Sequence, residues 1–206
     1  MPAFDVQAPL PRLPPIFRTT LGTMPADIPY LFADPALVEH WRRELSTLPG
    51  FKIGIVWQGN PIQRRDRQRS VPLAEFASLA RVAGVQLVSL QKGPGSEQLR
   101  QVTDRFDVID LGARTSSHFM DTAAVVKSLD LIVAVDTSVA HLAGALGVPV
   151  WVAVAFAPDW RYLLEREDSP WYPTMRLFRQ TELGKWQPVF ERMAEALNEH
   201  HGPPSI

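Results

Sequence analysis

A short polar turn between two apolar segments holds residue types suited to binding an anion. Residues 131–135 form an unbroken apolar run, which is typical of a parallel strand buried on both faces. Asp136, Thr137 and Ser138 interrupt it, and from Val139 onward the apolar residues recur at helical spacing. A helix start offers free backbone N–H groups and the positive end of the helix dipole, which together attract phosphate. The turn therefore predicts a phosphate site.

His141 lies one helical turn further on and shares a helix face with this turn, so it can reach the same anion. The hydroxyls of Thr137 and Ser138 can add donors. A structural alternative stays open, in which Asp136 or Thr137 only caps the helix and His141 is a partly buried helix residue.

A second polar segment carries positive charge. Four arginines lie within residues 64–69, after an apolar strand expected over residues 51–57. The carboxyl ends of parallel strands meet at one edge of a sheet, where ligands collect, so this segment and the Asp136 turn can close on one anionic ligand. The alternative is a solvated, charged loop.

The elements that position these groups follow an alternating pattern. Strands are expected near residues 52, 86, 108, 132 and 150. Helices are expected between them, for example over residues 72–82 and 119–127, with a last strand over 175–178 and a closing helix over 186–200. This pattern predicts an α/β fold with a doubly wound, Rossmann-like parallel sheet.

Composition and missing motifs exclude several classes of function. The chain has a net charge of −1 and no cysteine, which disfavours nucleic-acid binding and excludes thiolate chemistry. No glycine fingerprint for a dinucleotide and no P-loop motif occurs. Carboxylates are not clustered at metal-ligand spacing, so we expect neither a metal nor a cofactor. No segment is apolar enough for a transmembrane span or a signal peptide, and we expect a cytoplasmic protein.

The first 49 residues differ from the rest. They are rich in proline, at positions 2, 9, 11, 14, 15, 25, 29, 35 and 49. We expect one strand over residues 4–10, an extended loop over 11–31, and a helix that starts at Asp34-Pro35 and ends near Leu48. The predicted organisation is therefore a remnant of a preceding domain plus a linker over 1–49, followed by a Rossmann-like domain over 50–206.

Several segments together resemble the C-terminal half of family 9 glycosyltransferases, the family of the ADP-heptose heptosyltransferases. They are IGIVWQGNP, DRQRSVPL, VSLQKG, DTAAVVKSLDLIVAVDTSVAHLAGALGVPVWV and SPWYPTMRLFRQ. The Asp-Thr-x-x-x-His turn is the most specific part, and bacterial members with tetratricopeptide repeats are the most similar. The resemblance implies a GT-B architecture of two Rossmann-like domains, in which the C-terminal domain binds a nucleotide sugar and the N-terminal domain binds the acceptor.

Carried over to the turn, the resemblance implies that Asp136 lies close to the sugar. The backbone amides of Thr137 and Ser138 would meet the diphosphate, and His141 would assist there. The family turn often has glycine at the position of Ser138, which is a departure in this chain.

Elsewhere the resemblance implies that Arg69 neutralises phosphate charge and that Gln91 and Lys92 belong to a loop beside the nucleotide. The base would be read by loops around Gln91 and Phe119. The donor would be an ADP-sugar or a UDP-sugar, transferred without a metal and with inversion of configuration.

The acceptor half of such an enzyme is largely absent from the chain, so its catalytic residues are unknown. A separate acceptor domain or a protein acceptor would be the partner, and transfer by this chain alone is doubtful. One alternative is a non-catalytic interaction module that uses an apolar face with Phe4, Leu10, Leu13 and Ile16. A weaker alternative is a sugar-nucleotide epimerase.

Overall fold

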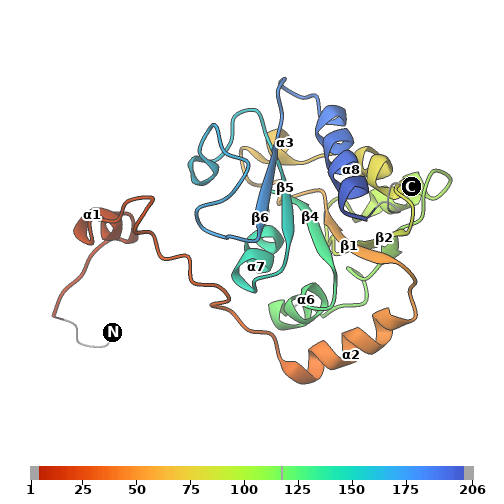
Figure 1. Cartoon of the computed structure of the whole chain (residues 1–206), viewed down its shortest axis with the longest axis horizontal. Coiled ribbons are helices and arrows are strands. Elements are labelled where there is room, and N and C mark those ends of the chain that lie inside the picture. The colour runs from red at the N-terminus through yellow and green to blue at the C-terminus, as the bar shows by residue number, and fades with distance from the viewer. Residues whose placement is uncertain (1–4, 117, 202–206) are drawn as a thin grey trace.

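The computed structural model describes residues 5–116 and 118–201 and contains one six-stranded parallel sheet in the order β3-β2-β1-β4-β5-β6 (Figure 1). The strands are β1 (Phe51–Val56), β2 (Val85–Ser89), β3 (Ile109–Asp110), β4 (Leu131–Val135), β5 (Val150–Val154) and β6 (Met175–Arg179). All six lie where apolar runs predict them, and the predicted doubly wound, Rossmann-like sheet is confirmed.

The strand order reverses beside β1. This strand pairs with β2 on one side and with β4 on the other, so that Ile53 lies between Leu87 and Leu131. The chain therefore winds outward in one direction through β2 and β3, and in the other direction through β4, β5 and β6. In sheets of this kind a crevice opens at the reversal, beyond the carboxyl ends of the strands.

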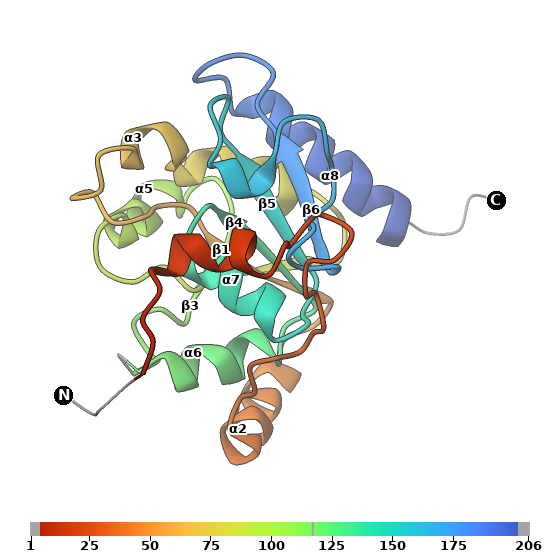
Figure 2. The same cartoon turned by 90° about the vertical axis from the view of Figure 1, so that its left-hand side faces the viewer.

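Each face of the sheet is covered by helices. The helices α2 (Pro35–Ser46), α6 (Phe119–Val126) and α7 (Ser138–Ala145) cover one face. The helices α4 (Ala77–Ala80), α5 (Leu99–Val102) and α8 (Gln187–His201) cover the other, as Figures 1 and 2 show. Alternate residues of β4 enter the two cores, which explains why this strand is apolar throughout.

Helix ends form where the local sequence provides partners for the backbone. The carboxylate of Asp34 accepts hydrogen bonds from the amides of Ala36 and Leu37 at the start of α2, as its N-cap position predicts. Gly147 follows the end of α7 with a φ of +71°, a left-handed conformation that glycine adopts readily at helix ends. The predicted helix over residues 72–82 is instead a 3-10 turn, η2 (Leu73–Phe76), followed by α4.

Short helical turns occupy several loops. They are α3 (Asp66–Arg69), η3 (Ser96–Gln98) and η4 (Trp160–Tyr162). Within the described residues, no helix combines the length and the apolar character needed to cross a bilayer.

The expected strand over residues 4–10 is wrong where it can be compared. Phe4 lies outside the described residues, residues 5–9 form no strand, and Leu10 begins the 3-10 turn η1 (Leu10–Arg12). The helical turn α1 (Leu13–Ile16) follows, within the segment predicted as an extended loop. Prolines lack the amide donor that a strand needs but suit the first turn of a helix, and they are frequent in this segment.

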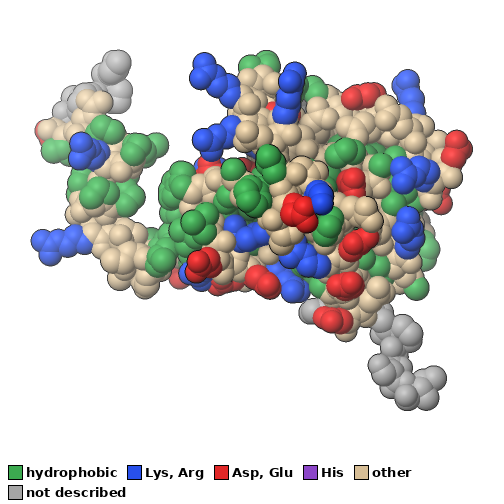
Figure 3. All heavy atoms as spheres, turned by 90° about the horizontal axis from the view of Figure 1, so that it is seen from above, with side chains coloured by type: hydrophobic (Ala, Val, Ile, Leu, Met, Phe, Trp, Pro, Cys, Tyr) green, Lys and Arg blue, Asp and Glu red, His purple; other side chains and the backbone are tan. Residues whose placement is uncertain are grey.

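In Figure 1 the part of this N-terminal segment that holds α1 lies apart from the sheet domain, and the chain then runs along the domain to α2. It meets the domain at the end of α7, where the amides of Tyr30 and Leu31 donate to the carbonyl of Ala145. Seen from above, hydrophobic side chains gather on the segment and on the adjoining side of the domain (Figure 3).

Candidate functional site

A cleft of about 550 Å³ opens at the strand reversal, beyond the carboxyl ends of β1, β2 and β4. The loop after β1 contributes residues 58–61, the loop after β2 contributes Gln91 and Lys92, and the start of α7 contributes residues 137–139. Arg69 completes the lining between the β1 loop and α7. The cleft therefore lies where α/β sheets of this order bind ligands.

The start of α7 presents unused hydrogen-bond donors to this cleft. Thr137 is the N-cap residue and has an extended backbone, yet its side chain makes no capping bond. Its hydroxyl is buried and has no hydrogen-bond partner among the described residues. The first two amides of the helix, from Ser138 and Val139, have no backbone partner in the described part of the chain either. Neither Asp136 nor Thr137 therefore caps the helix with its side chain, although Thr137 occupies the N-cap position.

Arg69 is one of two cationic residues that line the cleft, the other being Lys92. Its guanidinium donates to the backbone carbonyl of Asp136, and its Nε lies 3.3 Å from the Asp66 carboxylate at the start of α3. A Cβ at Gly59 would lie within 2.4 Å of both side chains, so only glycine lets the β1 loop pack against this pair. The other three arginines of residues 64–69 are exposed and do not line the cleft, although Arg65 lines the small cavity beside Asp136.

Asp136 and His141 lie next to the cleft but do not line it. One carboxylate oxygen of Asp136, Oδ1, accepts a hydrogen bond of 2.8 Å from the hydroxyl of Tyr162, and Nε2 of His141 lies 3.4 Å from the same oxygen. Burial raises the pKa of Asp136, but the bonds from His141 and Tyr162 outweigh it and hold this pKa below its ordinary value. A small cavity of about 40 Å³ beside Asp136 is lined by Arg69 and Tyr162 as well.

Gln91 lines the cleft, but its side chain is engaged by the protein. Its Oε1 accepts from the amides of Trp57 and Gln58, at 3.2 and 3.1 Å, and its Nε2 donates to the carbonyls of Gln58 and Pro94. The residue is 4% exposed. Gln91 therefore shapes the cleft by joining the loops after β1 and β2, and its amide has little capacity left for a ligand.

Lys92 crosses from the β2 loop to the segment before α6. Its Nζ donates to the carbonyl of Ser116 and lies 3.4 Å from the hydroxyl of Thr122. Burial lowers the pKa of Lys92, and the nearby Asp121 carboxylate partly offsets this effect. The amine remains at the rim of the cleft, next to Phe119.

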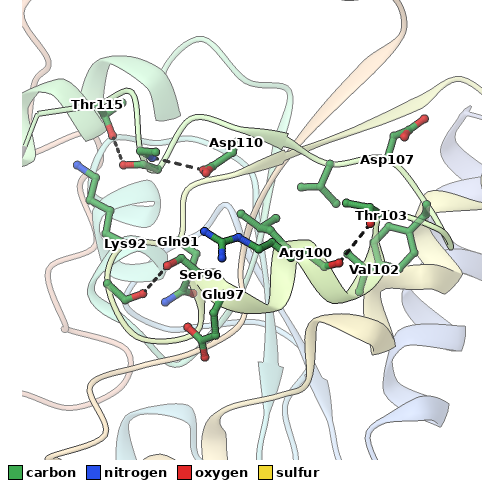
Figure 4. Close-up of a pocket in the computed structure, with 16 residues that line it drawn as sticks. Gln91, Lys92, Ser96, Glu97, Arg100, Val102, Thr103, Asp107, Asp110 and Thr115 are labelled. Carbon is green, nitrogen blue, oxygen red and sulfur yellow. Dashed lines mark hydrogen bonds between the residues drawn. The ribbon is translucent and has the colours of Figure 1, made fainter.

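A second cavity of about 760 Å³ adjoins the cleft and shares Gln91 and Lys92 with it. It lies between the β2 loop, α5 and the loop after β3 (Figure 4). Arg100 extends across the middle of this cavity, and Asp110 lies along its upper side. The two cavities together form a trough along the carboxyl edge of the sheet.

The structure thus brings the seven predicted residues to one edge of the sheet. Five line the cleft, namely Arg69, Gln91, Lys92, Thr137 and Ser138. Asp136 and His141 lie immediately beside it. Sequence reasoning missed Tyr162, which lies 26 residues after Asp136 and is brought to it only by the fold. Within the described residues, no group of three or more metal-ligating side chains occurs.

Comparison with known proteins identifies a family that this chain resembles. Residues 67–154 match the sequence model of glycosyltransferase family 9 (heptosyltransferase). The chain is also 30% identical over 204 residues to protein FlbA of Caulobacter vibrioides, which covers 95% of this chain and 33% of that protein. The resemblance to family 9 glycosyltransferases is therefore confirmed, and the chain spans about a third of the length of this curated relative.

Solved structures show the same fold. ADP-heptose LPS heptosyltransferase II of E. coli is 19% identical, with a TM-score of 0.57 over 86% of this chain and 55% of that one. A family 9 glycosyltransferase of Veillonella parvula is 15% identical, with a TM-score of 0.56 over 84% and 47%. The E. coli heptosyltransferase WaaC with ADP-2-deoxy-2-fluoro heptose is 16% identical, with a TM-score of 0.55 over 85% and 52%. The chain spans about half of each.

Proposed function

We propose that the cleft binds a nucleoside-diphosphate sugar and that the protein acts as a glycosyltransferase. One observation carries the proposal: the buried, unpartnered hydroxyl of Thr137 lies beside two free helix amides and the guanidinium of Arg69, at the reversal of the sheet. An unpartnered buried hydroxyl costs about 1–3 kcal/mol, and a phosphate oxygen bound at this position would remove that cost. Structures of a similar fold hold ADP and ADP-2-deoxy-2-fluoro heptose, which supports the same class of ligand.

In the proposed pose the diphosphate lies on the amides of Ser138 and Val139 and against Arg69. The nucleoside extends toward Lys92 and Phe119, where the trough continues. The sugar lies on the other side of Arg69, beside Asp136. ADP-sugars and UDP-sugars both fit this description, because the diphosphate provides most of the fixed contacts.

The proposed chemistry follows from where charge develops. When the bond between the sugar and the diphosphate breaks, negative charge grows on the leaving phosphate. The amides at the start of α7, the helix dipole and Arg69 are already aimed at that position, so they stabilise the transition state more than the ground state. We propose an inverting reaction in which these groups perform the role that a metal ion has in other transferases.

The acceptor side of the reaction is part of the proposal. Residues 50–206 form the donor-binding domain in this assignment, and residues 1–49 form the end of an acceptor domain with its linker. In this proposal a separate domain or protein binds the acceptor and supplies the base that deprotonates it. The alternative of a non-catalytic interaction module is favoured by one observation, the exposure of Val6, Leu10 and Phe17 by 73–87%.

The experiment is a calorimetric titration of the chain with ADP, UDP and GDP. Arg69→Ala should weaken binding of the preferred nucleotide by about 10-fold or more, since a charge-assisted bond to phosphate contributes roughly 1.5–3 kcal/mol. The matched control is Arg67→Ala, which removes an exposed arginine from the same short helix and should leave the affinity unchanged. Urea unfolding of both variants separates lost binding from lost stability.

Two results would overturn the proposed function. In the first, the wild-type chain binds none of the three nucleotides. In the second, Arg67→Ala and Arg69→Ala weaken binding equally, which would indicate a diffuse effect of charge.

A further inference from the structure

We infer that Tyr162 is a positioning residue that orients the Asp136 carboxylate toward the sugar of the donor, and that Arg179 holds the loop that carries Tyr162. This inference rests on the proposed function and deepens it, because it assigns the recognition of the sugar to a loop after β5. Tyr162 lies 26 positions after Asp136 in the sequence.

The two protein partners of Asp136 act on one oxygen. The Tyr162 hydroxyl and the His141 ring both meet Oδ1, at 2.8 and 3.4 Å. No donor from the described residues reaches the other oxygen, Oδ2. Fixing Oδ1 from two sides sets the plane of the carboxylate and leaves Oδ2 free to accept a hydrogen bond from a sugar hydroxyl.

The charge states suit this arrangement. The bonds from His141 and Tyr162 keep the pKa of Asp136 low, so at neutral pH its carboxylate only accepts. Burial and the adjacent Asp136 raise the pKa of Tyr162, so its hydroxyl keeps its proton and donates. The direction of the hydrogen bond is therefore fixed.

The space beside Asp136 limits what can bind there. The cavity of about 40 Å³ has a lining that includes the charged or polar side chains of Arg65, Arg69, Asp136, Asp159 and Tyr162. A cavity of about 10–15 Å³ already holds one water, so this one has room for one or two hydroxyl groups and not for a whole sugar ring. A polyhydroxylated sugar that lies over the cavity with one hydroxyl inserted matches both the volume and the polar lining.

The loop that carries Tyr162 is built under strain. Leu163 has a φ of +54°, which is unusual for a residue other than glycine and persists only where surrounding contacts impose it. Those contacts come from Arg179 at the end of β6. Its guanidinium donates to the carbonyls of Arg166 at 2.8 Å, Leu163 at 3.1 Å, and Tyr162.

A second set of bonds fixes the other side of the same loop. The Asp159 carboxylate accepts from the amide of Arg161 at the start of η4, and the indole of Trp171 donates to the carbonyl of Arg161. Tyr162 itself is 2% exposed. The hydroxyl of Tyr162 therefore reaches Asp136 from a loop that is held at both ends, as orientation of a carboxylate requires.

The test separates recognition of the sugar from recognition of the nucleotide. We would measure dissociation constants for ADP and ADP-heptose, and for UDP and UDP-glucose, by calorimetry. The sugar increment is the ratio of the nucleotide constant to the nucleotide-sugar constant. Tyr162→Phe, which removes only the hydroxyl, should reduce the sugar increment about 5- to 10-fold and change the nucleotide constant less than 2-fold.

Two further variants complete the design. Tyr30→Phe removes a tyrosine hydroxyl that contacts Tyr172 and not Asp136, and it should leave the increment unchanged. Arg179→Lys leaves Tyr162 intact but loosens its loop, and it should reduce the increment in the same direction. If Tyr162→Phe does not fold, the sugar increment of Arg179→Lys still tests the inference.

The outcomes distinguish the two proposals. If the wild-type chain binds no nucleotide, the proposed function fails and this inference fails with it. If the wild type binds nucleotide but has no sugar increment, or if Tyr162→Phe and Arg179→Lys both retain the increment, only the role of Tyr162 is overturned.

Discussion

Thr137 combines burial with an unsatisfied hydrogen-bonding group, and this combination makes a test possible at the scale of a single residue. Gln91, its neighbour in the cleft, differs from Thr137 because both ends of its side-chain amide form hydrogen bonds with backbone groups. We therefore propose that Thr137 serves binding, whereas Gln91 joins two loops, although both residues line the same cleft.

We predict that Thr137→Val stabilises the unliganded chain and weakens nucleotide binding. Valine has nearly the shape of threonine without the orphan hydroxyl, so the free energy of unfolding should rise by about 0.5–2 kcal/mol. Binding of the preferred nucleotide should weaken about 5-fold, because one donor to the diphosphate is lost. Urea unfolding and calorimetry measure the two effects. A variant that is less stable and binds normally would show that the hydroxyl has a structural role.

At the scale of elements, the site depends on how α7 packs. Gly144 lies in this helix opposite the Tyr172 ring, and a Cβ at this position would lie 2.4–2.9 Å from three ring or side-chain atoms of Tyr172. The close approach lets the loop after η4 lie against α7. The same helix carries His141, whose ring centroid is 5.8 Å from that of Tyr172.

Gly144→Ala tests this packing, because the substitution can either raise or lower the free energy of unfolding. In a freely exposed helix the change should stabilise the protein by about 1 kcal/mol, through helix propensity. Here we predict a loss of about 1–3 kcal/mol, because the new methyl group displaces Tyr172 from the helix. Thermal unfolding with a fixed buffer measures the difference. A rise in melting temperature would show that the loop after η4 moves away from α7 without destabilising the protein.

At the scale of the whole molecule, the N-terminal segment and the sheet domain differ in how they are stabilised. The domain has apolar cores on both faces of its sheet. In contrast, the apolar side chains of Val6, Leu10 and Phe17 are 73–87% exposed. The segment joins the domain through Tyr30 and Leu31, at the end of α7.

Removal of residues 1–27 should therefore change the free energy of unfolding by less than about 1 kcal/mol, since little apolar area is uncovered. The matched control is removal of residues 1–33, which also deletes the two amide bonds to Ala145 and the packing of Ala33. It should destabilise the domain by a clearly larger amount. Urea unfolding compares the two. Equal losses would show that residues 5–27 contribute to the fold of the domain.

The strand and turn pattern was predictable because its causes are local. Apolar runs of five or six residues and the Asp34-Pro35 helix start each act through neighbours in the sequence. The expected strand over residues 4–10 failed for the opposite reason. A strand needs a partner edge, and apolar residues among prolines do not provide one.

The sequence by itself determined which residue types stand at the carboxyl ends of the strands, and hence that an anion site at this edge was to be expected. The tertiary structure alone decided what each of them does. The side chain of Gln91, in the loop expected beside the nucleotide, binds the backbone of a loop 33 residues away. The carboxylate of Asp136 contacts Tyr162, in a strained loop after the next strand, as well as His141. Contacts of this kind form only when distant segments fold together, and no local periodicity records them.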